Sequence, residues 1–175
     1  MKNIFKTLAM AAMSIAMVSM VACDPEPDPN PTPAPDPTVA SSLYAFQYDN
    51  QTMAPGDTIQ FHPNRNQINN DMAQVNFYMV NKTEQELQTI MKVELVSGPA
   101  ELNTLEICYS DNCRTYPCPW TSETFTLVPG VNTDMRMTID YAPSVINGES
   151  IYRITIGKGA AMEEPQVMFL SMYAE

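Results

Sequence analysis

From Leu43 onward, apolar and polar side chains alternate with a period of two residues. This period places successive side chains on opposite faces of an extended chain, so each alternating run predicts a half-buried β-strand. Turn-forming pairs such as Gly98-Pro99 and Pro129-Gly130 bound the runs. The pattern predicts strands at about residues 43–48, 58–61, 75–80, 87–97, 105–108, 124–127, 135–141, 152–156 and 167–173.

About seven to nine short strands without helical periodicity are typical of an all-β, antiparallel, immunoglobulin-like (Ig-like) β-sandwich. Residues 43–175 are long enough to bury one hydrophobic core, so we assign them to a single domain. The runs at residues 75–80 and 87–97 are separated by an exposed turn, and we expect them to form a central hairpin.

The beginning of the chain follows another pattern. Residues 1–6 include Lys2 and Lys6, and residues 8–22 form an almost continuous apolar run. About fifteen apolar residues are fewer than the ~20 that a membrane-spanning helix needs. A basic start followed by a short apolar run is typical of a secretory signal peptide, which we assign to residues 1–22.

Residues 23–42 separate this signal peptide from the first strand, and they are rich in proline and acidic residues. Proline fixes φ and pushes the preceding residue toward extended conformations. The segment therefore predicts a disordered, extended stalk, and its proline-rich part from Asp24 to Thr38 spans roughly 45 Å at ~3.1 Å per residue. Its expected role is that of a spacer.

Charge and motifs restrict the function. The chain holds 20 Asp and Glu against 9 Lys and Arg, a net charge of −11. Nucleic acids are bound through clustered Lys and Arg, so we exclude a nucleic-acid partner. The catalytic motifs G-x-S-x-G and H-E-x-x-H and the P-loop do not occur, and we predict neither enzymatic activity nor a cofactor. A small hydrolase that uses Glu163 and Glu164, or Asp134 and Asp140, is a remote alternative.

Three of the four cysteines lie close together, at Cys108, Cys113 and Cys118. In an exported protein they meet an oxidising compartment, so we expect a disulfide. We prefer Cys108–Cys113, which would join the two sides of a turn; a pairing with Cys118 is the alternative, and one thiol is left over. We predict no metal site, because the spacing C-x4-C-x4-C differs from zinc motifs and the lone His62 is distant in sequence.

Three aromatic residues accompany these cysteines: Tyr109, Tyr116 and Trp120. Such residues are candidates for an aromatic platform that binds a sugar or a peptide. In the alternative interpretation Trp120 packs on the disulfide and covers the core, since aromatic side chains mostly serve burial.

The sequence Met20-Val21-Ala22-Cys23 resembles the lipobox of bacterial lipoproteins. The resemblance implies cleavage before Cys23 and a diacylglycerol on its thiol, and therefore a lipid anchor of the palmitate type in a membrane. The acidic residues that follow resemble the export signal of Bacteroidota lipoproteins. This implies an outer-membrane protein exposed on the cell surface, with the periplasmic face as the alternative.

Two further resemblances lie in the domain. Asp57-Thr58-Ile59 resembles the O-glycosylation acceptor of Bacteroidota, which makes Thr58 a candidate site. Residues 73–157, with Ser97-Gly98-Pro99-Ala100 and the cysteine stretch, resemble a small Ig-like domain of exported Bacteroidota lipoproteins and cell-surface proteins; such domains share no enzymatic activity.

Together, these features predict a non-catalytic envelope lipoprotein that presents an Ig-like interaction or adhesion module, with a protein or glycan ligand. An accessory subunit of an outer-membrane glycan-uptake or secretion complex is the alternative.

Overall fold

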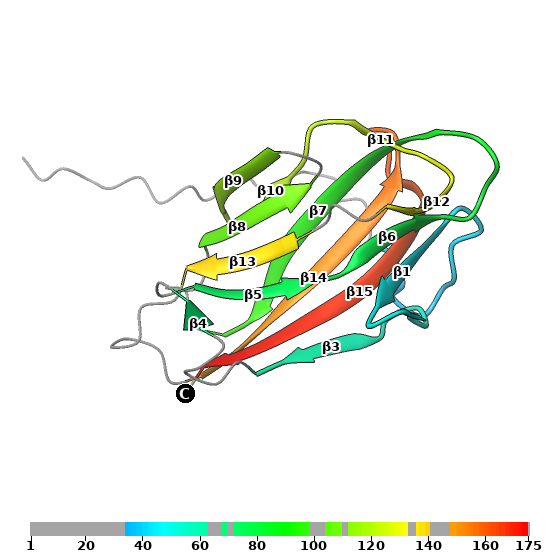
Figure 1. Ribbon diagram of the computed structural model, residues 1–175. Helices are drawn as coiled ribbons and strands as arrows, with labels where there is room; N and C mark the ends of the chain where they lie inside the picture. The colour runs from blue at the N-terminus through cyan, green and yellow to red at the C-terminus, as the bar shows by residue number, and fades with distance from the viewer. Residues whose placement is uncertain are drawn as a thin grey trace, which may run out of the picture. The chain divides into compact units, whose positions relative to one another are not determined.

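The computed structural model of the chain describes residues 34–62, 68–69, 72–98, 104–109, 112–132, 136–140 and 148–174. Every regular element in these ranges is a β-strand. The strands, labelled in Figure 1, are β1 (Tyr44–Tyr48), β2 (Gln51–Thr52), β3 (Thr58–Phe61), β4 (Ile68–Asn69), β5 (Met72–Asn76), β6 (Tyr78–Asn81), β7 (Leu87–Ser97), β8 (Thr104–Tyr109), β9 (Asn112–Pro117), β10 (Trp120–Thr121), β11 (Phe125–Leu127), β12 (Gly130–Asn132), β13 (Arg136–Asp140), β14 (Gly148–Lys158) and β15 (Glu163–Ala174).

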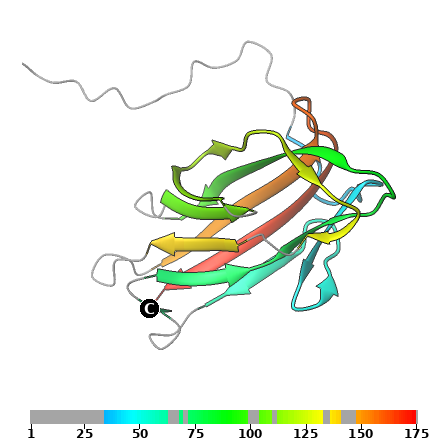
Figure 2. The same cartoon turned by 45° about the horizontal axis from the view of Figure 1, so that its top comes forward.

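The strands form two layers, and Figure 2 shows β5, β13 and β8 in front of β7, β14 and β15. The rear layer is one sheet in the order β10–β7–β14–β15–β3, with β11 also paired to β7. The front layer consists of two sheets, β12–β6–β1–β2 and β4–β5–β13–β8–β9. Only Phe77 separates β5 from β6, so one stretch of chain passes from one front sheet to the other.

This strand order is that of an Ig-like β-sandwich, in which strands A, B, E and D form one sheet and C, F and G the other. Here β1, β5 with β6, β13 and β8 take the first set of places, and β7, β14 and β15 take the second. The strands β1 and β3 lie in different layers, because β1 pairs with β6 whereas β3 runs parallel to β15. The predicted all-β sandwich is confirmed.

Alternation along the strands creates the core between the layers. Inward side chains from every long strand are buried, among them Phe46, Met91, Tyr152 and Leu170. The rings of Phe46 and Phe77 meet edge to face with their centroids 6.0 Å apart, which joins β1 to the β5–β6 junction. Complete burial of one such side chain contributes ~1.5–3 kcal/mol.

The expected hairpin between residues 75–80 and 87–97 is not formed. The strand β6 pairs with β1 and β12, whereas β7 lies in the rear layer beside β14. The turn between them therefore crosses from one layer to the other. Alternation reports which face of a strand is buried, but it carries no information on the neighbouring strand.

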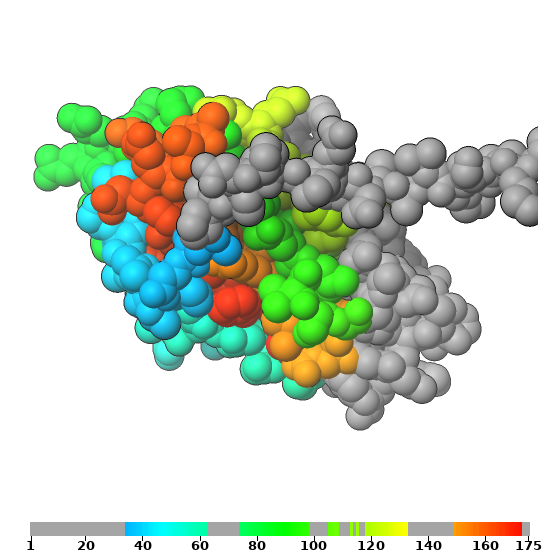
Figure 3. Space-filling model, turned by 180° about the vertical axis from the view of Figure 1, so that it is seen from behind, coloured from blue at the N-terminus to red at the C-terminus, as the bar shows by residue number. Residues whose placement is uncertain are grey.

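The compact unit begins at Ala34, earlier than the expected boundary at Leu43. Seen from behind in Figure 3, the first residues of the unit, in blue, lie against the orange and red residues of the rear sheet. The buried Ser41 makes the main contacts: its N–H donates to Gln166 Oε1 (3.1 Å), and its hydroxyl donates to the carbonyl of Glu164 (2.6 Å).

Two further contacts hold the preceding residues. Arg153 donates a hydrogen bond from its guanidinium to the carbonyl of Pro35. The carbonyl of Pro37 lies so close to Gly56 that a Cβ there would come within 2.9 Å of its oxygen. Asp36 Oδ1 accepts hydrogen bonds from the N–H and hydroxyl of Thr38, which closes a turn. Residues 34–42, assigned to the stalk from the sequence, thus belong to the compact unit.

Candidate functional site

The strands β8 and β9 form a hairpin that brings two of the predicted cysteines together. Cys108 and Cys113 are directly opposite in the antiparallel register, where side chains of paired residues are nearest neighbours. Their sulfurs form a disulfide, with the Cα atoms 4.0 Å apart. Cys108 is buried and Cys113 is exposed. The preferred pairing is confirmed.

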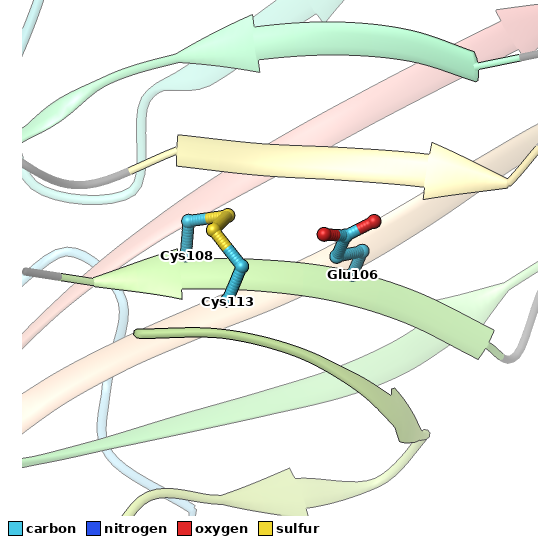
Figure 4. A group of neighbouring side chains, drawn as sticks. All are labelled: Glu106, Cys108 and Cys113. Carbon is cyan, nitrogen blue, oxygen red and sulfur yellow. A yellow bond between two sulfur atoms is a disulfide. The ribbon is translucent and has the colours of Figure 1, made fainter. Parts of the chain in front are cut away.

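Glu106 adds a carboxylate to the same place. It precedes Cys108 by two residues on β8, and Figure 4 shows its side chain on the same face of the hairpin as the disulfide. The carboxylate and the two sulfurs lie within 4.8 Å of one another. Cysteine binds a metal ion as the thiolate, whereas the two sulfurs here are bonded to each other in the disulfide. The oxidised hairpin therefore offers a single carboxylate.

Cys118 is the remaining thiol, and the alternative pairings with Cys118 are wrong. It is free, half-buried, and donates a weak hydrogen bond from Sγ to the carbonyl of Val93 on β7, 3.6 Å away. Desolvation by burial raises the pKa of the Cys118 thiol to about 11. Because the thiolate is the reactive form, this thiol is a poor nucleophile near neutral pH. The register explains the outcome, since β9 faces β8 along its whole length.

Trp120 does not belong to an exposed platform. Its strand, β10, pairs with β7 through Trp120 and Val93, and its side chain is 8% exposed within the hydrophobic core. It therefore takes the alternative role, that of a core residue. Tyr109 and Tyr116 lie on β8 and β9, and their side chains are outside the described residues. A platform formed by these two tyrosines stays a prediction.

Thr58 is at the start of β3, an edge strand of the rear sheet, and its side chain is exposed. The preceding Asp57 accepts a hydrogen bond from the N–H of Ala54 (2.7 Å), which fixes the turn that leads into the strand. The position is open to a modifying enzyme, and O-glycosylation of Thr58 stays a prediction.

The four carboxylates that we named for the remote hydrolase alternative differ in their positions and contacts. Glu164 Oε2 accepts hydrogen bonds from the N–H and hydroxyl of Ser42, at 3.4 and 3.1 Å, and so holds the start of the compact unit. Glu163 is exposed, Asp140 is on β13, and Asp134 lies outside the described residues. His62 is exposed at the end of β3.

Cys23 lies outside the described residues, as do the predicted signal peptide and most of the predicted stalk. Within the described ranges, no helix is long and apolar enough to span a bilayer.

The sequence analysis missed the residues that hold the start of the unit, Ser41 and Gln166. A signal was present: Asp36-Pro37-Thr38 is a turn-forming triplet, and a polar Ser41-Ser42 pair lies just before β1, separated from it by Leu43.

Comparison with known proteins identifies the fold. The chain matches no known family model and no curated protein. Among solved structures, the N-terminal domain of PorA is similar with a TM-score of 0.56 and 10% identity, over 75% of this chain and 97% of that chain. A PapD-like domain of human CEP192 has a TM-score of 0.41 and 9% identity, over 83% and 93% of the two chains. At such identities the likeness to the PorA domain shows the Ig-like fold alone.

Proposed function

We propose that this chain is a non-catalytic, lipid-anchored protein of a bacterial outer membrane that presents an Ig-like interaction module on a stalk at the cell surface. The observation that carries the proposal is the Ig-like β-sandwich itself, shared with the N-terminal domain of PorA. Sandwiches of this kind present loops and sheet edges to partners and are used in many binding proteins.

The sequence before the sandwich supports the anchor. The lipobox-like residues end at Cys23, and two acyl chains on its thiol would hold a protein stably on a membrane. Glu164 contacts Ser41 and Ser42, and Arg153 contacts Pro35, so we limit the proposed stalk to residues 24–33. An extended chain of that length spans roughly 30 Å at ~3.1 Å per residue.

Fractionation of cells that express the full-length chain tests the anchor. We expect the native protein in the membrane fraction, Cys23→Ala in the soluble fraction, and Cys118→Ala in the membrane like the native protein. Protease treatment of intact cells should release peptides of the sandwich if it faces outward. A Cys23→Ala protein that stays with the membrane, or an unmodified Cys23 in the mass spectrum, would refute the lipid anchor.

Crosslinking on intact cells followed by affinity purification tests the interaction role. A specific partner that is recovered with the crosslinker and lost in detergent washes without it supports a separate interaction module. Stable co-purification with an outer-membrane β-barrel supports the accessory-subunit alternative instead. A turnover that a single carboxylate substitution abolishes would refute the non-catalytic assignment.

A further inference from the structure

A pocket of about 280 Å³ opens on the side of the sandwich where β1 and β3 part. Residues of β1, the β1–β2 turn, β3, β5 and β6 line it, so both layers contribute. It is remote in sequence from the cysteine hairpin, and no sequence motif indicated it.

The pocket originates in an interruption of the front layer. On β6, pairing with β1 begins at Tyr78, and on β5, pairing with β4 is limited to Met72 and Ala73. Among the described strands, none pairs with residues 74–77 on this side of the chain, whereas β13 pairs with β5 on the other side. Gln74 and Asn76 of the open edge are exposed and line the pocket.

The β1–β2 turn adds rigid polar groups above this edge. Tyr48 is paired with Gln51, so the turn has two central residues, Asp49 and Asn50. Both have positive φ, 49° and 61°, as a type I′ hairpin turn requires. The two side chains are exposed and line the pocket from positions fixed by the hairpin.

Three aromatic side chains complete the lining: Tyr48, Phe61 and Tyr78. Each is half-buried. Tyr48 and Phe61 also pack against the hydrophobic core, so their rings are anchored from behind and keep a surface toward the pocket. Immobilised rings lose little conformational entropy when a ligand stacks on them.

We propose that this pocket binds a neutral sugar of one or two rings. Aromatic rings offer apolar faces to the C–H groups of a sugar, and amide and carboxylate groups can donate to and accept from its hydroxyls. Among the described residues of the lining, the one charged side chain is the carboxylate of Asp49, which disfavours an anionic ligand on this face of the pocket. The pocket volume is just below the ~300–1,000 Å³ of pockets for drug-sized ligands, so we limit the ligand to one or two sugar rings.

An extended peptide that pairs with the open edge of β5 is the competing occupant. Between the described pairings of β5 with β4 and of β6 with β1, no more than residues 74–77 are available for such pairing, which is a short segment for a peptide strand. By contrast, the aromatic rings of the lining match the C–H groups of a sugar, and the amide groups of the lining match its hydroxyls. The assignment rests on the proposed interaction role, because it names the ligand class of that module, but it does not depend on the lipid anchor.

The test is ligand-observed saturation-transfer NMR on the purified full-length protein with cellotriose, maltotriose, xylotriose and mannotriose, and with an uncharged polythreonine peptide. We expect at least one trisaccharide to bind with a Kd on the order of 1 mM. Gln74→Ala should weaken binding about tenfold, and Asp49→Asn, which keeps the turn geometry, should weaken it by several fold. Gln88→Ala, an exposed glutamine on β7, is the matched control and should bind like the native protein.

Tyr78→Ala should remove binding, and its thermal unfolding curve shows whether the variant folds. Because Gln74 is exposed, Gln74→Ala keeps the test valid if Tyr78→Ala does not fold. Failure of all four sugars to bind, equal binding by Gln74→Ala and Gln88→Ala, or binding of the peptide alone would overturn the assignment. A partner captured on intact cells by a protein that binds no sugar would leave the interaction role standing.

Discussion

Removal of the Cys108–Cys113 bridge should lower the stability of the sandwich by about 2 kcal/mol. The bridge closes a loop with a sequence separation of 5. The loop-closure relation gives an entropy of about 7 cal/mol/K for a loop of that length, which is about 2 kcal/mol at room temperature. A bridge across a longer loop would contribute more, so the short hairpin sets a modest value.

Cys113→Ser is the preferred variant because Cys113 is exposed, whereas Cys108 is buried and its replacement would also leave a cavity. Urea unfolding can be followed by the fluorescence of Trp120, the single tryptophan, which is buried in the native state. For a chain of this size, a loss of 2 kcal/mol also lowers Tm by about 4–8 °C.

A control variant distinguishes the effect of losing the disulfide from the effect of losing a free thiol. Cys118→Ala removes the free thiol and leaves the bridge intact. Added reductant should destabilise both the native protein and Cys118→Ala, and it should leave Cys113→Ser unchanged. Equal unfolding midpoints for native protein and Cys113→Ser, or an equal effect of reductant on Cys113→Ser, would refute the reasoning.

Three further predictions follow from contacts in the compact unit. Ser41→Ala should lower the free energy of unfolding by about 1–3 kcal/mol and speed proteolysis of residues 34–42, because it leaves buried hydrogen-bonding groups unpaired. Ser42 is exposed, so Ser42→Ala should lower the free energy of unfolding by less than ~0.5 kcal/mol. Equal losses for the two variants would contradict this prediction. Both Gly98 and Gly130 have positive φ, but a Cβ at Gly98 would lie 2.6 Å from the backbone of β14 and one at Gly130 would contact nothing within 4 Å. Gly98→Ala should therefore lose more than ~2 kcal/mol and Gly130→Ala about 1 kcal/mol in urea unfolding, and the reverse order would refute the steric argument. Burial raises the pKa of Cys118 from 9.0 to about 11, so the folded state holds this proton more tightly than the unfolded chain. The free energy of unfolding should therefore fall as pH rises from about 9 through about 11. The unfolding midpoint of Cys118→Ala should fall less over this range, and an identical pH profile for the two proteins would refute the assignment.

Local sequence information was sufficient for the strands with strict alternation. The strand β7 has the predicted bounds, because Met91, Val93 and Leu95 alternate with Lys92 and Glu94 in its central part. The alternation pattern predicts no strand at β9, because the sequence from Asn112 to Pro117 shows no clear alternation. Its pairing with β8 is set by the facing cysteines, and this information is not local.

The alternation pattern also could not predict that the front layer is divided into two sheets. Val75, Phe77 and Met79 all point inward, so the period continues through the point where pairing changes from β5 to β6. The pocket depends on that change and on the turn at Asp49 and Asn50. A site formed by an interruption of strand pairing has no motif, because its residues come from five separate elements.

The position of β15 determines when the sandwich can form. It pairs with β14 on one side and with β3 on the other, so without β15 the strand β3 is not joined to the rest of the rear sheet. A polypeptide leaves the ribosome from its N-terminus, and β3 must therefore wait for a partner more than a hundred residues later in the chain. Closure is delayed until residue 174 has emerged, and folding dominated by such distant pairings is slow. A nascent chain that has not yet reached β15 therefore leaves β3 without this partner and exposes side chains such as Ile59, which is buried in the folded sandwich.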